Sequence, residues 1–174
     1  MHTHPSLSII MVESPQMGLL SRHKKEKTKA ETYYQSIKKV RCPYFGAEIT
    51  FNSEGFHHLQ FSAERERPKQ EQLLKFSLLP SVPHILENAG TIQEYRHTME
   101  PIGQKRFSDG AREMKKIEYW GIVAITRGQK PIRIKIILRR VGDGNIIFWS
   151  VMPTIKLKDR DSYMHLASRN ISEE

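Results

Sequence analysis

Cations recur in alternation along the segment "IRIKIILRR", residues 132–140. If this segment is a β-strand, Arg133, Lys135 and Arg139 share one face, because successive side chains of a strand point to opposite sides. Guanidinium groups bind phosphate through paired hydrogen bonds, so such a face is suited to a nucleic-acid backbone. A half-wet sheet also carries charges on its solvent face without any function, and the pattern by itself leaves both interpretations open.

The segment "KIEYWGIVAIT" is expected to add an aromatic ring and a carboxylate to that open face. Placing Ile117 and Tyr119 toward the core puts Glu118 and Trp120 on the open side. Trp120 is then a stacking platform for an unpaired base. Glu118 is a weaker candidate for a carboxylate base, since it rests on this face assignment alone.

A hydroxyl is expected beside these groups, from the segment "IIFWSVMP". Both alternating sets of side chains in this segment are apolar, so periodicity does not decide which set is buried. Burying Trp149 leaves Ser150 on the open face, and this is the orientation that we favour. The hairpin turn "VGDGN" before it does not fix the register.

The elements that must position these residues form two groups along the chain. The second half predicts four consecutive strands joined by turns, hence an antiparallel meander, with "TIQEYRHT" as the first. The first half predicts mainly helices. A charged helix is expected over residues 21–41 and ends before Pro43, and a short strand follows in "AEITF". A helical turn capped by Asn52 or Ser53 is expected in "NSEGFHHLQF", and an amphipathic helix pair in "KQEQLLKFSLLPSVPHILENAG". The expected fold is α+β, with N-terminal helices packed on one face of a four-stranded antiparallel sheet.

Three regions are expected along the chain. Residues 1–42 are a basic, partly helical extension that either packs on the domain or acts as an arm on a nucleic-acid backbone, residues 43–156 are the domain itself, and residues 157–174 are a tail.

The chain has 174 residues and a formal net charge of +9, which favours nucleic acid, an anionic surface or an acidic partner. Cys42 is the single cysteine, so no internal disulfide is possible. No apolar run approaches the roughly 18 residues that span a bilayer, and no signal peptide is recognised. We therefore expect a cytoplasmic protein that does not bind membranes.

In this order the segments "ITFNSEGFHHLQF", "ERERP", "EQLLKFSLLP", "EYWGIVAI" and "IKIILRRVGDGNIIFWSVMP" resemble the phage-associated nuclease grouping of barnase, EndoU, colicin tRNase and RelE-like enzymes, over residues 46–156. The resemblance implies a toxin-like, metal-independent endoribonuclease of a mobile element, with no cofactor. In such enzymes the 2′-hydroxyl attacks the adjacent phosphate of an RNA, and the expected RNA here is a tRNA or an mRNA. It also implies an acidic antitoxin or immunity protein as partner.

Four positions that match the resemblance are the expected catalytic residues: His58, Arg65, Arg139 and Ser150. Histidine shuttles protons near neutral pH, arginine grips phosphate, and a serine hydroxyl binds a phosphate oxygen or the reacting hydroxyl. We prefer His58 over the adjacent His57.

The remaining candidates surround these four. In "ERERP" we prefer Arg65 over Arg67. Lys135, Trp120 and Arg140 are expected to bind substrate around the catalytic residues. No metal is expected, because Cys42 and the two adjacent histidines lack the spacing of a zinc site.

Two other functions fit the same features. A non-catalytic basic phage protein that binds RNA or DNA shares the charge and the open face, and predicts salt-sensitive binding without cleavage. Alternatively, the open face of the sheet docks another protein.

Overall fold

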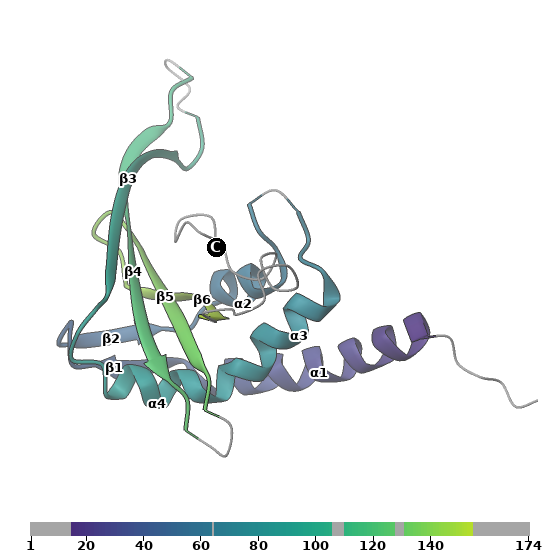
Figure 1. The fold of residues 1–174 in the computed structure, drawn as a ribbon. Coiled ribbons are helices and arrows are strands. Elements are labelled where there is room, and N and C mark those ends of the chain that lie inside the picture. Colours follow the sequence, from purple (N-terminus) through teal and green to yellow (C-terminus); the bar gives the residue numbers. More distant parts are fainter. Residues whose placement is uncertain (1–14, 64, 106–109, 128–130, 155–174) are drawn as a thin grey trace, which may run out of the picture.

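The computed structural model describes residues 15–63, 65–105, 110–127 and 131–154 (Figure 1). The start of the expected extension and the expected tail of residues 157–174 lie outside these ranges. The described elements are α1 (Pro15–Ile37), β1 (Lys39–Cys42), β2 (Ala47–Thr50), α2 (Ser53–Gln60), α3 (Lys69–Leu78), the 3₁₀ turn η1 (Leu79–Ser81), α4 (Val82–Glu87), β3 (Glu94–Ile102), β4 (Glu113–Ile125), β5 (Arg133–Val141) and β6 (Ile147–Pro153).

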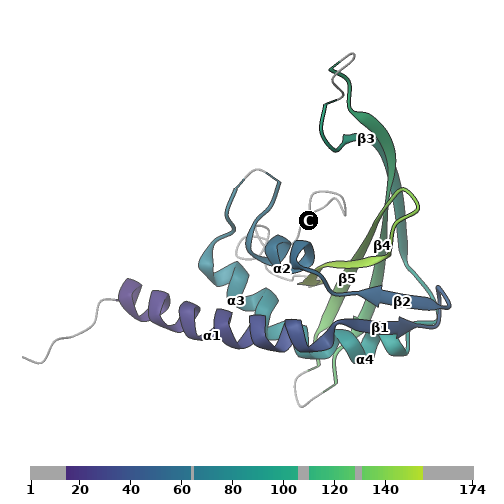
Figure 2. The same ribbon diagram turned by 180° about the vertical axis from the view of Figure 1, so that it is seen from behind.

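The fold is α+β, built on one six-stranded sheet in the order β1-β2-β6-β5-β4-β3. Strands β3 to β6 form the expected antiparallel meander. The expectation of four strands was wrong, because β1 and β2 extend the sheet beyond β6 and make it mixed. The only parallel pairing described joins Thr50 of β2 to Ile147 of β6. Figures 1 and 2 show the β3–β4 hairpin rising well beyond the body of the molecule.

The described part of the expected N-terminal extension belongs to the same packed unit. Helix α1 ends at Ile37, earlier than Pro43, because Lys38 turns to a positive φ of 55° and the next four residues pair with β2 as strand β1. On α1, Ala30 and Tyr34 are buried in the main core. A four-residue strand between a charged helix and a proline is too short to show any periodicity in the sequence.

Local signals at the helix ends behave as expected. Asn52 caps α2 by accepting a hydrogen bond from the backbone N–H of Gly55 at 3.1 Å, the usual role of a side-chain oxygen at that position. Helix α3 begins directly after Pro68. Pro80 lies in the 3₁₀ turn that separates α3 from α4, as the proline break in the amphipathic pair predicts.

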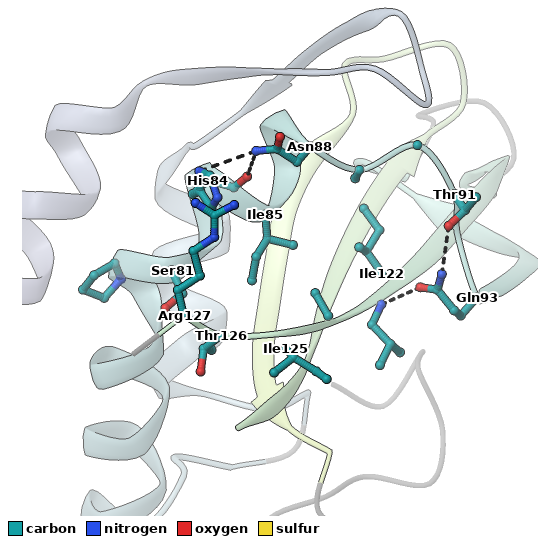
Figure 3. Close-up of a pocket in the computed structure, with 15 residues that line it drawn as sticks. Ser81, His84, Ile85, Asn88, Thr91, Gln93, Ile122, Ile125, Thr126 and Arg127 are labelled. Atoms are coloured by element: carbon teal, nitrogen blue, oxygen red, sulfur yellow. Dashed lines mark hydrogen bonds between the residues drawn. The ribbon is translucent and has the colours of Figure 1, made fainter. Parts of the chain in front are cut away.

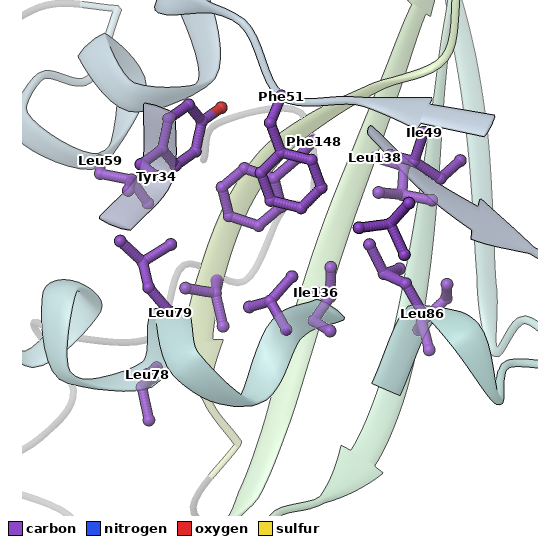
Figure 4. Packing of buried hydrophobic residues seen from close by; sticks show 14 of the residues in the cluster. Tyr34, Ile49, Phe51, Leu59, Leu78, Leu79, Leu86, Ile136, Leu138 and Phe148 are labelled. Carbon is purple, nitrogen blue, oxygen red and sulfur yellow. The ribbon is translucent and has the colours of Figure 1, made fainter. Parts of the chain in front are cut away.

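The main hydrophobic core lies between the sheet and the helices (Figure 4). Phe51 and Phe148 stack at its centre with ring centroids 4.9 Å apart. Tyr34 reaches them from α1, and Leu138 and Ile136 reach them from β5. No helix among the described residues has the length and apolar character needed to cross a membrane.

The alternation of β5 assigns its faces as expected. Ile134, Ile136 and Leu138 are fully buried in the main core, and Ile137 belongs instead to a second, smaller cluster on the opposite face. Arg139 is two positions from Ile137 and therefore shares that opposite face.

The faces expected for β4 were wrong. Trp120 lies directly opposite Leu138, and Glu118 lies directly opposite Arg140, so both point to the face of the main core. Ile117 and Tyr119 belong to the second cluster with Ile137. Both alternating sets of β4 contain large apolar side chains, so the sequence pattern did not distinguish them.

Candidate functional site

A β-bulge in β6 decides where its side chains point. Leu138 pairs with Phe148 and the preceding Ile137 pairs with Ser150, so Trp149 is an extra residue in β6. The bulge breaks the strict alternation. Phe148 therefore joins the main core, whereas Ser150 turns to the face of Ile137. The bulge therefore places side chains from each of the two alternating sets expected from the sequence on both faces of the sheet.

Trp149 is the centre of the candidate site. The imidazole of His58, from α2, stacks on its indole with ring centroids 4.1 Å apart and an interplanar angle of 24°. The guanidinium of Arg139, from β5, lies 4.4 Å from the ring centroid of the same tryptophan. Two of the four expected catalytic residues, far apart in sequence, thus meet on one aromatic ring.

The loop after α2 adds a second arginine. Arg67 Nη2 lies 3.4 Å from His58 Nε2, Arg67 Nε donates to the His58 carbonyl at 3.2 Å, and Arg67 Nη1 pairs with Glu71 at 2.7 Å. A guanidinium only donates hydrogen bonds, so it faces the lone pair of Nε2 and favours the proton of the neutral ring on Nδ1. Arg67 is thereby held at the edge of the His58 ring.

Arg65, the arginine preferred from sequence, lies elsewhere. It is exposed at the tip of this loop, where its backbone N–H and carbonyl bond to Ser62. The loop turns back through a bridge between Phe61 and Glu66, and the backbone N–H of Arg67 then bonds to Gln60. This return places the second arginine of "ERERP", not the first, beside His58.

Ser150 is fully buried and bonded to a lysine. Lys75 of α3 donates to Ser150 Oγ at 3.0 Å and to the carbonyl of Val151 at 3.3 Å, and it is itself only 1% exposed. The expectation of an open hydroxyl was wrong, since Ser150 lies beneath α3. Ser150 instead binds the ammonium group of Lys75, whose charge is among those that act on the His58 imidazole.

The electrostatics of His58 follow from this setting. Burial, then the charges of Arg67, Lys75, Arg139 and His57, lower the pKa of His58 from 6.5 to about 2. Both effects disfavour the imidazolium form, since a buried cation loses hydration and is repelled by like charges. The imidazole is therefore neutral at physiological pH.

Arg139 lines a small pocket at one end of the site. Its Nε is buried and has no hydrogen-bond partner in the described part of the chain. Its Nη1 reaches Glu54 at 3.5 Å. A pocket of about 260 Å³ beside it is lined by α2, β2 and the β5–β6 turn, with Asn52 and Asn145 among its polar groups. The hydrogen-bond donors among the lining residues, Arg139, Asn52 and Asn145, are of types that bind an oxyanion.

The expected substrate-binding residues divide between the two faces. Lys135 lies on the face of Arg139 and forms an ion pair with Glu94 at 2.5 Å. Trp120 and Arg140 lie on the opposite face, with the Arg140 guanidinium 5.3 Å from the indole centroid. The single open face that the sequence analysis assembled from all of them is therefore not formed.

Sequence reasoning missed Lys75 and Trp149, and it set Arg67 second to Arg65. Lys75 lies on the buried face of α3, which it shares with the polar Gln72 as well as with Phe76 and Leu78, so no apolar stripe in the sequence marked its position. Trp149 gave no signal, because the bulge that exposes its ring to His58 depends on the pairing of β5 with β6.

A separate pocket of about 500 Å³ lies between α4 and the end of β4 and shares no lining residue with the His58 site (Figure 3). Its polar lining includes His84, Asn88 and Gln93, and Gln93 Oε1 accepts from the backbone N–H of Val123 at 2.6 Å. Asn88 Nδ2 donates to the His84 carbonyl at 2.8 Å, whereas Gln93 Nε2 donates to Thr91 at 3.1 Å, and Arg127 shares the lining with His84. Among the described residues, no three histidine, cysteine or acidic side chains gather as a metal site.

Comparison with known proteins finds no match: no family model, no curated protein and no solved structure is significantly similar to this chain.

Proposed function

We propose that this protein is an endoribonuclease that cleaves RNA by attack of the 2′-hydroxyl on the adjacent phosphate. The observation that carries the proposal is the geometry around His58: Arg67 Nη2 lies 3.4 Å from its Nε2, and Arg139 contacts the same Trp149 ring on which the imidazole stacks. A proton acceptor beside several cations is what this reaction needs, because the transition state gains negative charge on the phosphate. The order of short motifs that resembles the barnase and RelE-like nuclease grouping supports the same reaction.

In the proposed reaction Arg139 binds the scissile phosphate from the pocket beside it. The anion draws Arg67 toward its oxygens and frees Nε2 of His58. The phosphate charge also opposes the three cations that lower the pKa of His58, so the imidazole becomes more basic when substrate is bound. Substrate binding thus prepares the base.

The bonds and protons then balance without a further reactant. His58 takes the proton of the 2′-hydroxyl, the 2′ oxygen forms a bond to phosphorus, and the bond to the 5′ oxygen breaks. Solvent protonates the 5′ oxygen and receives the proton from His58. The products are a 2′,3′-cyclic phosphate and a free 5′-hydroxyl. Lys75, oriented by Ser150 and Val151, contributes positive charge.

The partner implied by the proposal is an acidic antitoxin or immunity protein that shields the basic site, and the location implied is the cytoplasm, where RNA is accessible. The described fold accommodates the proposal with a larger sheet than the four-stranded one that the resemblance implies.

A second candidate is a basic nucleic-acid-binding protein without catalysis. It is favoured by the complete burial of Ser150 and Lys75, which bond to each other as a structural pair does. It predicts RNA binding with no cleavage under any condition.

Cleavage of RNA by the purified protein in EDTA tests the proposal. The expected result is fragments that end in 2′,3′-cyclic phosphate, and no cleavage of the same RNA with 2′-O-methyl groups. His58→Ala and Arg139→Ala are expected to lower kcat/KM by at least about 100-fold, the usual range for a general base or a charge-stabilising group.

The chain offers matched controls for both variants. His57→Ala changes the neighbouring exposed histidine, which stacks on Phe61, and Arg65→Ala changes the exposed loop arginine. Both are expected to keep near wild-type activity. Intact RNA after prolonged incubation, with binding retained, would support the second candidate, and full activity in His58→Ala would remove His58 from the mechanism.

A further inference from the structure

Glu118 is the centre of a second polar cluster, on the face of the sheet opposite to Arg139. It is 6% exposed and accepts from Tyr95 Oη at 2.7 Å, from Lys116 Nζ at 2.9 Å, and from Arg140 Nε at 2.9 Å and Nη2 at 2.5 Å. Three side chains from β3, β4 and β5 are thus fixed by one carboxylate.

The carboxylate of Glu118 stays ionised in this setting. Burial raises its pKa, but the hydrogen bonds from Tyr95, Lys116 and Arg140 and the charge of Arg140 outweigh burial and lower the pKa to about 2. A buried acceptor with this many donors holds them in one arrangement. The cluster is therefore ordered before any ligand arrives.

Aromatic rings lie against this cluster. The Tyr95 ring packs against those of Trp120 and His97, with a centroid distance of 5.8 Å to each. Phe45 contacts Trp120 edge-on, with ring centroids 5.1 Å apart. Tyr95 is 45% exposed, although its hydroxyl is bonded to Glu118. Its ring is thus fixed at one end while part of it faces solvent.

Fixed cations flank the exposed ring. The Lys116 and Arg140 side chains are 46% and 36% exposed. Together they carry two positive charges and Glu118 carries one negative charge, so the cluster has a net charge of +1. The bonds of Arg140 to Glu118 use two of its five N–H donors, so others remain for an anion. An exposed aromatic ring beside exposed cations complements a base followed by a phosphate.

We propose that this face binds unpaired nucleotides of an RNA strand, with a base stacked on Tyr95 and its phosphate held by Arg140 and Lys116. The inference rests on the proposed RNA substrate but not on cleavage. It assigns single-stranded RNA as the preferred substrate class, because a paired base does not offer its face to a side chain. Tyr95 and Glu118 are new assignments, Tyr95 as the stacking group and Glu118 as the residue that positions it.

Position in the sheet separates this surface from the cleavage site. Arg139 and Arg140 are consecutive in β5 and point to opposite faces, since their partners across the ladder are Tyr119 and Glu118. Substitutions at Tyr95 are therefore not expected to disturb His58 or Arg139, and binding can be measured apart from catalysis.

Fluorescence anisotropy with a labelled 2′-O-methyl RNA of about twelve nucleotides tests the proposal, since site sizes for single strands are of that order and this probe resists the proposed cleavage. The matched duplex is the second probe. Tyr95→Ala is expected to weaken binding of the single strand about tenfold, the usual effect of removing one stacking ring, and to leave duplex binding unchanged.

Two further variants separate the ring from its bond to Glu118. Tyr95→Phe keeps the ring and loses the hydroxyl, and is expected to stay within about threefold of wild type. Met99→Ala removes an exposed side chain from the same face of β3, 55% exposed, and is expected to have no effect. Equal losses in Tyr95→Ala and Met99→Ala would indicate a general change of the hairpin and overturn the proposal.

The outcomes also distinguish this surface from the proposed cleavage. If Tyr95→Ala loses single-strand binding and the wild type does not cleave RNA, the binding surface is supported and the proposed nuclease activity is wrong. If the wild type cleaves RNA and Tyr95→Ala binds the single strand as well as the wild type does, the activity is supported and the binding surface is wrong. If the protein binds neither RNA probe but binds a polyglutamate peptide through Tyr95, the face belongs to an acidic protein partner, and the RNA assignment is wrong.

Discussion

Tyr34 is a buried tyrosine whose hydroxyl has no hydrogen-bond partner among the described residues. It is 2% exposed, and burial raises its pKa well above the usual value because ionisation there is disfavoured. The ring itself packs well, on Phe51, Phe56 and Phe148. The hydroxyl therefore loses its hydrogen bonds to water on folding, and no described residue replaces them.

Tyr34→Phe is expected to raise the free energy of unfolding by about 1 kcal/mol, since it removes an unsatisfied buried donor and keeps the ring. Urea denaturation followed by circular dichroism measures the change. Tyr33→Phe is the control, because Tyr33 is 37% exposed on the same helix and its hydroxyl loses little on folding. A loss of stability in Tyr34→Phe would mean that the hydroxyl has a partner.

The lowered pKa of His58 predicts a pH dependence of stability. The unfolded chain binds a proton near pH 6.5 and the folded chain only near pH 2, so between these values the unfolded state binds more protons. Stability is fully present above pH 6.5 and falls as the pH drops below it. One such group contributes a slope of up to about 1.4 kcal/mol per pH unit.

Urea midpoints between pH 7.5 and pH 5 would be compared for the wild type and His58→Gln. His58→Gln is expected to lose this slope, and His57→Gln is expected to keep it. The range stops at about pH 5 because Glu118, whose pKa is lowered from 4.5 to about 2, begins to contribute as the pH approaches 4.5, where the unfolded chain takes up that proton. An unchanged slope in His58→Gln would show that His58 is protonated in the folded state.

The packing of α2 on β6 sets the geometry of the site. Helix α2 carries His58 and approaches β6 so closely that Gly55 faces the backbone carbonyl of Phe148 and the hydroxyl of Tyr34. A methyl group at this position would overlap with both atoms. Glycine is therefore needed here for the close approach rather than for its backbone angles.

Gly55→Ala is expected to lower the free energy of unfolding by about 3 kcal/mol, because a backbone atom cannot move aside as a flexible side chain does. It should also displace His58 from Trp149, which the near-ultraviolet circular dichroism of the tryptophan reports. Gly18→Ala is the control on α1, since a methyl group there meets nothing within 4 Å. A neutral Gly55→Ala would mean that α2 lies further from β6.

The net charge of +9 governs how the whole molecule meets a polyanion. RNA binding is expected to weaken steeply with salt, because each phosphate contact releases condensed counterions. For a single strand held at about five phosphates, the slope of log K against log salt concentration is about −3.5.

Fluorescence anisotropy between low and moderate salt measures this slope. Arg139→Gln is expected to reduce its magnitude by about 0.7, the value of one phosphate contact on a single strand. Lys29→Gln, at an exposed lysine of α1 paired with Glu26, should leave it unchanged. A slope near zero would exclude nucleic acid as the ligand of this basic chain.

The sequence by itself determined the elements and part of the chemistry. The order of helices and meander strands, the cap at Asn52 and the alternation of β5 depend on local patterns, in which each residue acts through its immediate neighbours. His58 and Arg139 were also found from sequence as candidates, and the structure brings both to Trp149.

Only the tertiary structure decided which side chains meet. The choice of Arg67 over Arg65 depends on the return of one loop, and the burial of Ser150 under Lys75 depends on a bulge that exists only when β5 and β6 pair. Trp120 and Glu118 lie on the face opposite to the one expected, because the register of β4 with β5 places them across from Leu138 and Arg140. A shift of one residue in a strand reverses every side chain, and no local pattern records that shift when both faces are apolar.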